Sequence, residues 1–224
     1  MKLFLPCLLL LLAACTDPVV PVAGPPGGSE AARIQRVVPA VEAAAEAECR
    51  RRAFGRNCDF LIVVDSDPAS PSNAYQTVDP GGRPVIILTL ALIGQAENDD
   101  ELAFVASHEA AHHIRDHLAR RERDMMEGAV VLGGLASLNG GSPADVETAQ
   151  RLGAVLGARR YSRQFELEAD ALGTVIAARA GFDPLVGAGF FTRIPDPGDR
   201  FLGTHPPNAE RVRMVQQTVA GLRS

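Results

Sequence analysis

The residues best suited to chemistry form one short motif, His108-Glu109-Ala110-Ala111-His112. It is an instance of the H-E-x-x-H signature. Two histidines four positions apart on a helix lie about 40° apart around its axis, so both imidazoles can bind one metal ion. Glu109 stands beside the first histidine without being a ligand, which suits it to take a proton from a water molecule. The motif therefore indicates metal-assisted hydrolysis, provided that the chain supplies a third ligand.

That third ligand is expected from an acidic stretch further along the chain, residues 165–170. Glu166 or Glu168 could complete a set of two histidines and one glutamate, and spacing alone does not choose between them. Asp170 lies one helical turn beyond Glu166 on the same face, where it can hydrogen-bond the outer nitrogen of a ligand histidine. Glu168 points in another direction and is expected to be solvated. The competing interpretation is a chance match, since two further histidines follow on the same helix.

The elements that must position these residues are mainly helical, with a few short strands. A capping-box pattern at Asn98 and Glu101 opens the motif helix, which we expect to continue to about Arg123. Pro84 opens the third strand and favours the edge of the sheet. The glycine-rich stretch 128–141 is interpreted as a loose helical connection or as a lid over a cleft. The expected helices are 30–52, 98–123, 142–180 with a break near Gly157, 185–193 and 208–222, and the expected strands are 60–64, 73–78 and 84–89.

Length and composition describe an ordinary folded protein. The chain has 224 residues, of which 46% are hydrophobic and 22% are charged, and this fits one or two domains. The formal net charge of −5 leaves no basic footprint for nucleic acid. We therefore expect no nucleic-acid partner.

The N-terminus has the character of an export signal. Residues 1–14 combine a positive start with an apolar run too short for a stable membrane anchor, which is typical of a signal peptide. Leu12-Ala13-Ala14-Cys15 resembles the bacterial lipobox, in which cleavage exposes a cysteine that is then acylated. The proline- and glycine-rich residues 15–28 are expected to form an extended tether, leaving 29–224 as the folded domain. Thr16 after the cysteine favours the outer membrane over the inner one.

The other cysteines of the exported chain are Cys49 and Cys58. Two cysteines nine positions apart in an oxidising compartment predict a disulfide. A cysteine metal site is the competing interpretation, but it lacks a second pair at ligand spacing. We prefer the disulfide.

Five stretches resemble the zinc metallopeptidases related to HtpX, the CAAX-prenyl endopeptidases and the BepA- and Oma-type proteases. They follow the family's order and together cover about residues 60–215. No transmembrane pattern follows the motif helix, which favours the lipid-tethered branch of that family. The matching stretches are residues 73–75, 100–105, 108–112, 162–170 and 204–207.

The resemblance implies an α+β fold, mainly helical, with a zincin-like core in which a small β-sheet packs on the motif helix. It implies one zinc ion per chain, held by His108, His112 and Glu166, with Asp170 as a supporting partner. The glutamate is the one that the family's E-x-x-x-D pattern supplies.

The resemblance also implies a role for His205, in the stretch His205-Pro206-Pro207. This histidine would stabilise the oxyanion, or occupy the open zinc position in a resting state. From the residues alone, His205 equally suits a cap before the last helix. Arg211 is a further candidate for supporting the same cleft.

The expected function is therefore a lipid-anchored zinc endopeptidase of the bacterial cell envelope, facing the periplasm. It would hydrolyse unfolded or mis-assembled envelope proteins, with Glu109 as the base and the peptide lying along strand 84–89. Its expected partners are a polypeptide substrate, the membrane through the lipid anchor, and envelope assembly machinery. The alternative is a chaperone-like or scaffolding lipoprotein whose zinc is latent or structural. Glu109 has no structural need, which favours the enzyme. A hydrolase of cell-wall peptides ranks third, because nothing in the chain resembles a wall-binding module.

Overall fold

The computed structural model describes residues 28–160, 162–196 and 206–223. The expected signal peptide, nearly all of the tether, Cys15 and His205 lie outside the described residues. Helices dominate and one small sheet accompanies them, so the predicted mainly helical α+β class is confirmed. In chain order the elements are α1 (Gly28–Arg52), β1 (Leu61–Asp65), β2 (Ala74–Val78), β3 (Pro84–Thr89), α2 (Leu90–Gln95), α3 (Asp99–Ile114), α4 (His117–Leu138), α5 (Pro143–Arg160), α6 (Ser162–Arg179), α7 (Pro184–Gly187), the short 3₁₀ helix η1 (Ala188–Thr192) and α8 (Asn208–Arg223).

The three strands form a sheet in the order β1-β3-β2, which makes β3 the central strand. β3 runs parallel to β1 and antiparallel to β2. The prediction that β3 lies at the edge was wrong. Pro84 is the first residue of the strand and pairs with Val78 at the end of β2. A proline at a strand's first position leaves the ladder beyond it intact, so it does not exclude a central place.

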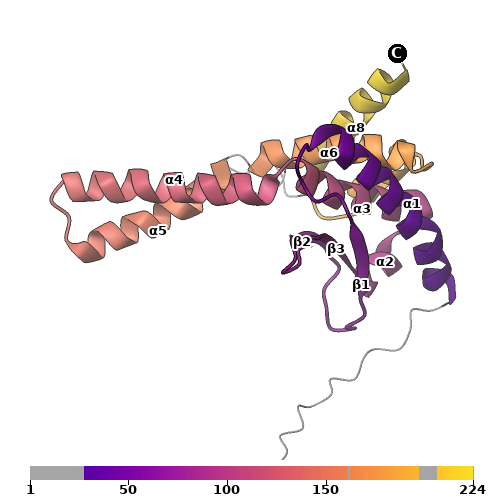
Figure 1. The fold of residues 1–224 in the computed structure, drawn as a ribbon, viewed down its shortest axis with the longest axis horizontal. Helices are drawn as coiled ribbons and strands as arrows, with labels where there is room; N and C mark the ends of the chain where they lie inside the picture. The colour runs from indigo at the N-terminus through magenta and orange to yellow at the C-terminus, as the bar shows by residue number, and fades with distance from the viewer. Residues whose placement is uncertain (1–27, 161, 197–205, 224) are drawn as a thin grey trace, which may run out of the picture.

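Helix α3, which carries the H-E-x-x-H motif, is the centre of the packing. It contacts β2 and β3 on one side and packs against α1 and α6 on others, as Figure 1 shows. Its start follows the predicted cap, because the Asn98 side chain accepts a hydrogen bond from the backbone N–H of Glu101 at 2.9 Å. Fully buried side chains from the sheet, α3 and α6 form one apolar core; they include Ile86, Leu88, Leu102, Phe104, Leu172 and Ile176.

The motif helix ends earlier than the sequence predicted. α3 stops at Ile114 and a separate helix, α4, begins at His117. Between them Asp116 adopts the left-handed region with φ 61°, which is uncommon for a residue other than glycine. The prediction of one helix to Arg123 was therefore wrong. No glycine or proline marks the break, so the residue pattern gave no signal for it.

Helices α4 and α5 form a hairpin that projects away from the sheet and the other helices (Figure 1). Glycines let the two helices touch: a Cβ on Gly153 would lie only 2.1 Å from the carbonyl oxygen of Gly128. The stretch 128–141 is thus largely a regular helix rather than a loose connection, and the predicted break near Gly157 falls inside α5. None of the helices within the described ranges, this hairpin included, is long and apolar enough to cross a membrane.

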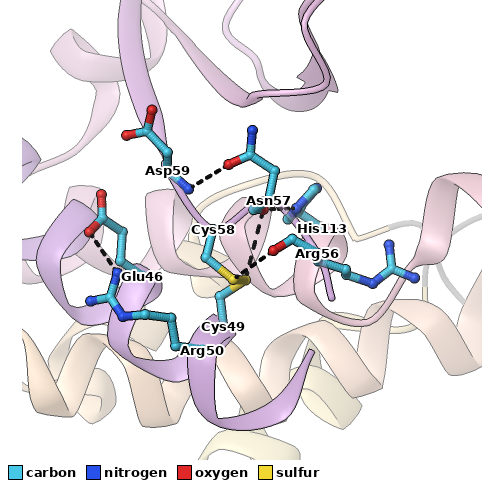
Figure 2. The surroundings of a disulfide bond; sticks show 8 residues. All are labelled: Glu46, Cys49, Arg50, Arg56, Asn57, Cys58, Asp59 and His113. Carbon is cyan, nitrogen blue, oxygen red and sulfur yellow. Dashed lines mark hydrogen bonds and ion pairs between the residues drawn. A yellow bond between two sulfur atoms is a disulfide. The ribbon is translucent and has the colours of Figure 1, made fainter. Parts of the chain in front are cut away.

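A disulfide closes the loop between α1 and β1. Cys49, near the end of α1, is bonded to Cys58, with 5.6 Å between their Cα atoms. The loop inside the disulfide also reaches α3, because a ring nitrogen of His113 lies 3.0 Å from the backbone oxygen of Asn57. Figure 2 shows both contacts. The disulfide therefore fastens α1 to the loop that packs against the end of the motif helix.

Candidate metal centre

Three side chains that the sequence separates by up to 58 positions converge at one point, where α3 and α6 cross. The two Nε2 atoms of His108 and His112 lie 3.0 Å apart. The carboxylate of Glu166 approaches both, at 3.5 Å from His108 Nε2 and 3.4 Å from His112 Nε2. These residues form a group able to hold a metal ion, whereas Glu168 is not part of it.

The close crossing of α6 over α3 depends on a glycine. A Cβ built on Gly173 would lie 3.0 Å from the backbone nitrogen and the Cα of His108. Gly173 follows Asp170 by one turn, so the face of α6 that carries the acidic residues is also the face that approaches α3. The small residue allows Glu166 to reach the histidines of the opposite helix.

The geometry fits zinc. In a tetrahedral site with bonds of about 2.0–2.2 Å, neighbouring ligand atoms stand about 3.3–3.6 Å apart. The two histidine nitrogens lie 3.0 Å apart, and one oxygen of Glu166 lies 3.5 Å from His108 and the other 3.4 Å from His112, so these distances are close to that range. Two imidazole nitrogens and one carboxylate leave a fourth position open, as in catalytic rather than structural zinc sites. His108, His112 and Glu166 would therefore hold the metal.

His108 is supported from behind by a buried ion pair. Its Nδ1 lies 2.9 Å from a carboxylate oxygen of Asp170. Arg211, from α8, donates two hydrogen bonds to the same carboxylate, at 2.8 and 2.7 Å, and its guanidinium stacks on the ring of Phe191 at 3.9 Å. Burial opposes ionisation of Asp170, but the hydrogen bonds from His108 and Arg211 outweigh it and hold the pKa of its carboxyl below its usual range. Asp170 is thus a permanent anion that orients His108.

The two ligand histidines hold protons very differently. Burial disfavours the charged form of His108, but its contacts with Asp170 and Glu166 outweigh this and raise its pKa to about 9. Burial and the charge of His108 lower the pKa of His112 to about 3. In the metal-free site, therefore, His108 is positively charged at neutral pH and His112 is neutral.

Glu109 lies at the cleft beside the ligands. It accepts a hydrogen bond from the backbone N–H of Gln76 on β2. Loss of hydration raises the pKa of Glu109 to about 7, His108 opposes the shift, and the nearby charge of Glu166 adds to it. A carboxyl with a pKa near neutrality can both take and release a proton at physiological pH, as a general base and acid must.

A second group, which sequence reasoning missed, lies behind His112. His117, the first residue of α4, has its Nδ1 2.8 Å from Nδ1 of His112. Its Nε2 lies 3.3 Å from Glu168, which also accepts a hydrogen bond of 2.7 Å from Arg120. The expectation that Glu168 is merely solvated was therefore wrong. His117 was overlooked because a continuous motif helix would place it on another face.

Burial sets the charge state of His117, and hydrogen bonds set that of Glu168. Burial lowers the pKa of His117 to about 4, against the opposing effect of Glu168. Burial also disfavours the carboxylate of Glu168, but the hydrogen bonds from Arg120, His117 and Gln164 outweigh it and lower its pKa to about 2. At neutral pH His117 is accordingly neutral and Glu168 is ionised.

The centre opens into a cleft of about 1060 Å³. Part of its lining is the segment from Ser72 to Gln76, which leads into β2 and includes its first three residues, and β2 is an edge strand of the sheet. The lining also includes the apolar and aromatic side chains of Phe165, Phe190, Phe191 and Ile194. Within the described residues, the cleft therefore brings an edge strand, apolar side chains and the ligand group around the same space.

The chain is similar to known peptidases in sequence. A family model described as "Peptidase family M48" matches residues 29–219. The chain is 33% identical to the "Beta-barrel assembly-enhancing protease" of Escherichia coli K12 over 119 residues, 50% of this chain and 24% of that protein. It is 31% identical to the "Mitochondrial metalloendopeptidase OMA1" of Saccharomyces cerevisiae over 170 residues, 70% of this chain and 46% of that protein. The matches thus span about a quarter to a half of these relatives' length. Among solved structures, S. mikatae Ste24p aligns with a TM-score of 0.45 and 17% identity, over 78% of this chain and 49% of that one.

Proposed function

Because the chain belongs to peptidase family M48, we propose that it is a lipid-anchored zinc endopeptidase that cleaves unfolded or mis-assembled proteins of the bacterial cell envelope. The observation that carries the proposal is the convergence of His108, His112 and Glu166, with Glu109 beside them in an open cleft. A structural metal site needs neither an open position nor an adjacent carboxyl with a pKa near 7.

The residues of the site have separate roles in peptide hydrolysis. A zinc ion held by His108, His112 and Glu166 would polarise the scissile carbonyl and make water more acidic. Glu109 takes one proton from the attacking water, whose oxygen forms a bond with the carbonyl carbon. Glu109 then donates this proton to the leaving amine nitrogen as the C–N bond breaks. His205 remains our proposed stabiliser of the oxyanion, as the resemblance to the family suggests.

The substrate lies along β2 rather than along β3. The free edge of β2 lines the cleft, and the backbone N–H of Gln76 already points at Glu109. An extended peptide can add to such an edge through main-chain hydrogen bonds, which are independent of side-chain identity. The aromatic residues of the cleft lining suit apolar side chains of the substrate, which unfolded proteins expose. These two features support a substrate that is extended and apolar rather than folded.

The envelope location rests on different residues. Residues 12–15 resemble a lipobox, and acylated Cys15 would anchor the chain through the tether of residues 15–28. The bacterial relative is named for enhancing β-barrel assembly, which supports substrates and partners in outer-membrane assembly. A periplasmic position facing that machinery would follow. Radiolabelled palmitate incorporated by the wild type but not by Cys15→Ala is the result expected.

The mechanism is tested by Glu109→Gln in the full-length chain purified in detergent. The amide keeps the shape of the side chain but cannot accept a proton, so we expect bound zinc to stay and cleavage of an unfolded protein to fall by about 10²–10⁴-fold. The matched control is Glu147→Gln, which changes an exposed glutamate on α5. Cleavage by Glu109→Gln at the control's rate would refute the mechanism. A zinc-loaded wild type that is idle and becomes active in His205→Ala would instead indicate a latent protease.

A further inference from the structure

We propose that His117 and Glu168 are positioning residues that hold the ligand histidine His112 in the one tautomer able to bind the metal. Neither residue belongs to the ligand group of His108, His112 and Glu166. The inference rests on the metal site proposed above and concerns how the chain prepares one of its ligands.

The first step is the proton arrangement that the contacts allow. A neutral imidazole has one N–H group, so the 2.8 Å contact between Nδ1 of His112 and Nδ1 of His117 requires exactly one donor. Nε2 of His112 faces Glu166 and His108, and a metal bound there needs that nitrogen without a proton. The proton of His112 must then be on Nδ1, which donates to His117.

The same proton arrangement extends from His117 to Glu168. If Nδ1 of His117 accepts, its own proton is on Nε2, which donates to the carboxylate of Glu168 at 3.3 Å. That carboxylate is held by Arg120 at 2.7 Å and by the Gln164 amide at 2.8 Å. One pattern of protons therefore satisfies every contact from the arginine to the ligand nitrogen. The reverse tautomer of His117 would leave an N–H facing the N–H of His112.

Packing fixes the ring of His117 in place for this task. The imidazole is buried and stacks on Phe165, with 4.6 Å between ring centroids and 10° between the planes. The guanidinium of Arg120 also lies over the ring of Phe165, 4.2 Å from its centroid. The ring therefore cannot turn freely away from His112.

The break between α3 and α4 is what brings His117 to this position. In one straight helix, residues five apart lie about 140° apart around the axis and cannot contact each other. The left-handed Asp116 ends α3, restarts the chain as α4 and places His117 beside His112. Asp116 is itself held by an ion pair with Arg56 at 2.7 Å. An uncommon backbone conformation thus serves the geometry of the metal centre.

The two ligand histidines are consequently oriented by different means. His108 donates directly to a carboxylate, Asp170, whereas His112 reaches a carboxylate only through a second imidazole. Partners of this kind orient a ligand and raise its basicity, and their loss lowers metal affinity by about 10- to 100-fold.

The test uses three substitutions in the full-length protein. His117→Phe keeps a ring that can stack on Phe165 but removes both nitrogens. His117→Asn restores an acceptor near the position of Nδ1. His113→Phe is the matched control, because His113 is a buried histidine of the same region whose ring nitrogen contacts Asn57 instead of the metal site. Zinc affinity is measured by competition with a chromophoric chelator, and ¹⁵N NMR of the metal-free proteins reports which nitrogen of His112 carries the proton.

We expect His117→Phe to lower zinc affinity by about 10- to 100-fold, His117→Asn to recover most of the loss, and His113→Phe to bind like the wild type. We also expect His112 to carry its proton on Nδ1 in the wild type. In metal-free His117→Phe only the contact with protonated His108 still favours this tautomer, so the share of His112 that carries its proton on Nε2 should rise. A merely structural role would not change the tautomer. Wild-type affinity and tautomer in His117→Phe would overturn this inference alone. A wild type that binds no zinc would overturn the proposed function as well.

Discussion

At the scale of single residues, the metal centre depends on where protons are held before any metal arrives. His108 lies between two carboxylates, those of Asp170 and Glu166, and this keeps its pKa near 9 although burial acts in the opposite direction. His112 has an imidazole behind it instead and stays neutral. A metal must therefore displace one proton, from His108, in order to bind.

This gives zinc binding a defined pH dependence. Between about pH 7.5 and pH 8.5, above the pKa of Glu109 and below that of His108, each unit of pH should raise the apparent zinc affinity by about tenfold, because binding releases one proton. His112, with a pKa of about 3, contributes no proton in this range. Chelator competition at several pH values measures the slope. An affinity that does not change with pH would contradict the protonated state of His108.

At the scale of elements, the site exists because α6 crosses α3 at very short range. Glu166 and Asp170 on α6 meet the two histidines of α3 only while the helix backbones remain close, and Gly173 is the residue that permits this. A methyl group at position 173 would press on the backbone of His108, which cannot move aside as a flexible side chain would.

We therefore expect Gly173→Ala to weaken the centre. The helices must separate by a few tenths of an ångström, so zinc affinity should fall by about tenfold or more and stability by about 1–3 kcal/mol. Isothermal titration and thermal unfolding measure the two effects. The control is Gly134→Ala on α4, where the added Cβ meets nothing within 4 Å and alanine favours the helix. Equal behaviour of the two variants would show that the crossing tolerates a side chain.

The sequence predicted the group of His108, His112 and Glu166, which the structure brings together, but it predicted only some of the elements that carry the site. The three strands begin and end within one residue of expectation, because apolar runs and turn residues are local signals. The place of β3 in the sheet was wrong, because strand order depends on pairing between distant segments. The break at Asp116 was missed for a related reason. A left-handed aspartate held by Arg56, 60 positions away, leaves no mark in its neighbours. Because the break was missed, the contacts of His117 with His112 and Glu168 were not predicted either.

At the scale of the whole molecule, the resemblance to zinc metallopeptidases related to HtpX, the CAAX-prenyl endopeptidases and the BepA- and Oma-type proteases is confirmed by a family match that covers most of the chain. The fold consists of a packed domain around α3 and a projecting α4–α5 hairpin (Figure 1). The hairpin base, at Leu118 and Arg121, lines the cleft. Near the C-terminal end of α3, the Cys49–Cys58 disulfide secures the loop that touches His113 (Figure 2).

The disulfide should stabilise the domain without taking part in catalysis. Its loop spans nine positions, which corresponds to about 2–3 kcal/mol of chain entropy removed from the unfolded state. The double substitution Cys49→Ser with Cys58→Ser should lower Tm by about 4–10 °C in calorimetry. A reducing agent should lower the Tm of the wild type by a similar amount and leave the double variant unchanged. A wild-type Tm that does not change with the reducing agent would contradict the stabilising role of the disulfide.

The central claim is that three residues of two crossing helices hold one metal ion that peptide hydrolysis requires. The most direct measurement is the rate of cleavage of an unfolded protein by the full-length chain, first stripped of metal with a chelator and then titrated with zinc. Our account predicts no cleavage without metal, a rise that levels off at one zinc per chain, and no recovery at the same free zinc in Glu166→Ala. Cleavage by the metal-free protein, or full recovery in Glu166→Ala, would contradict it.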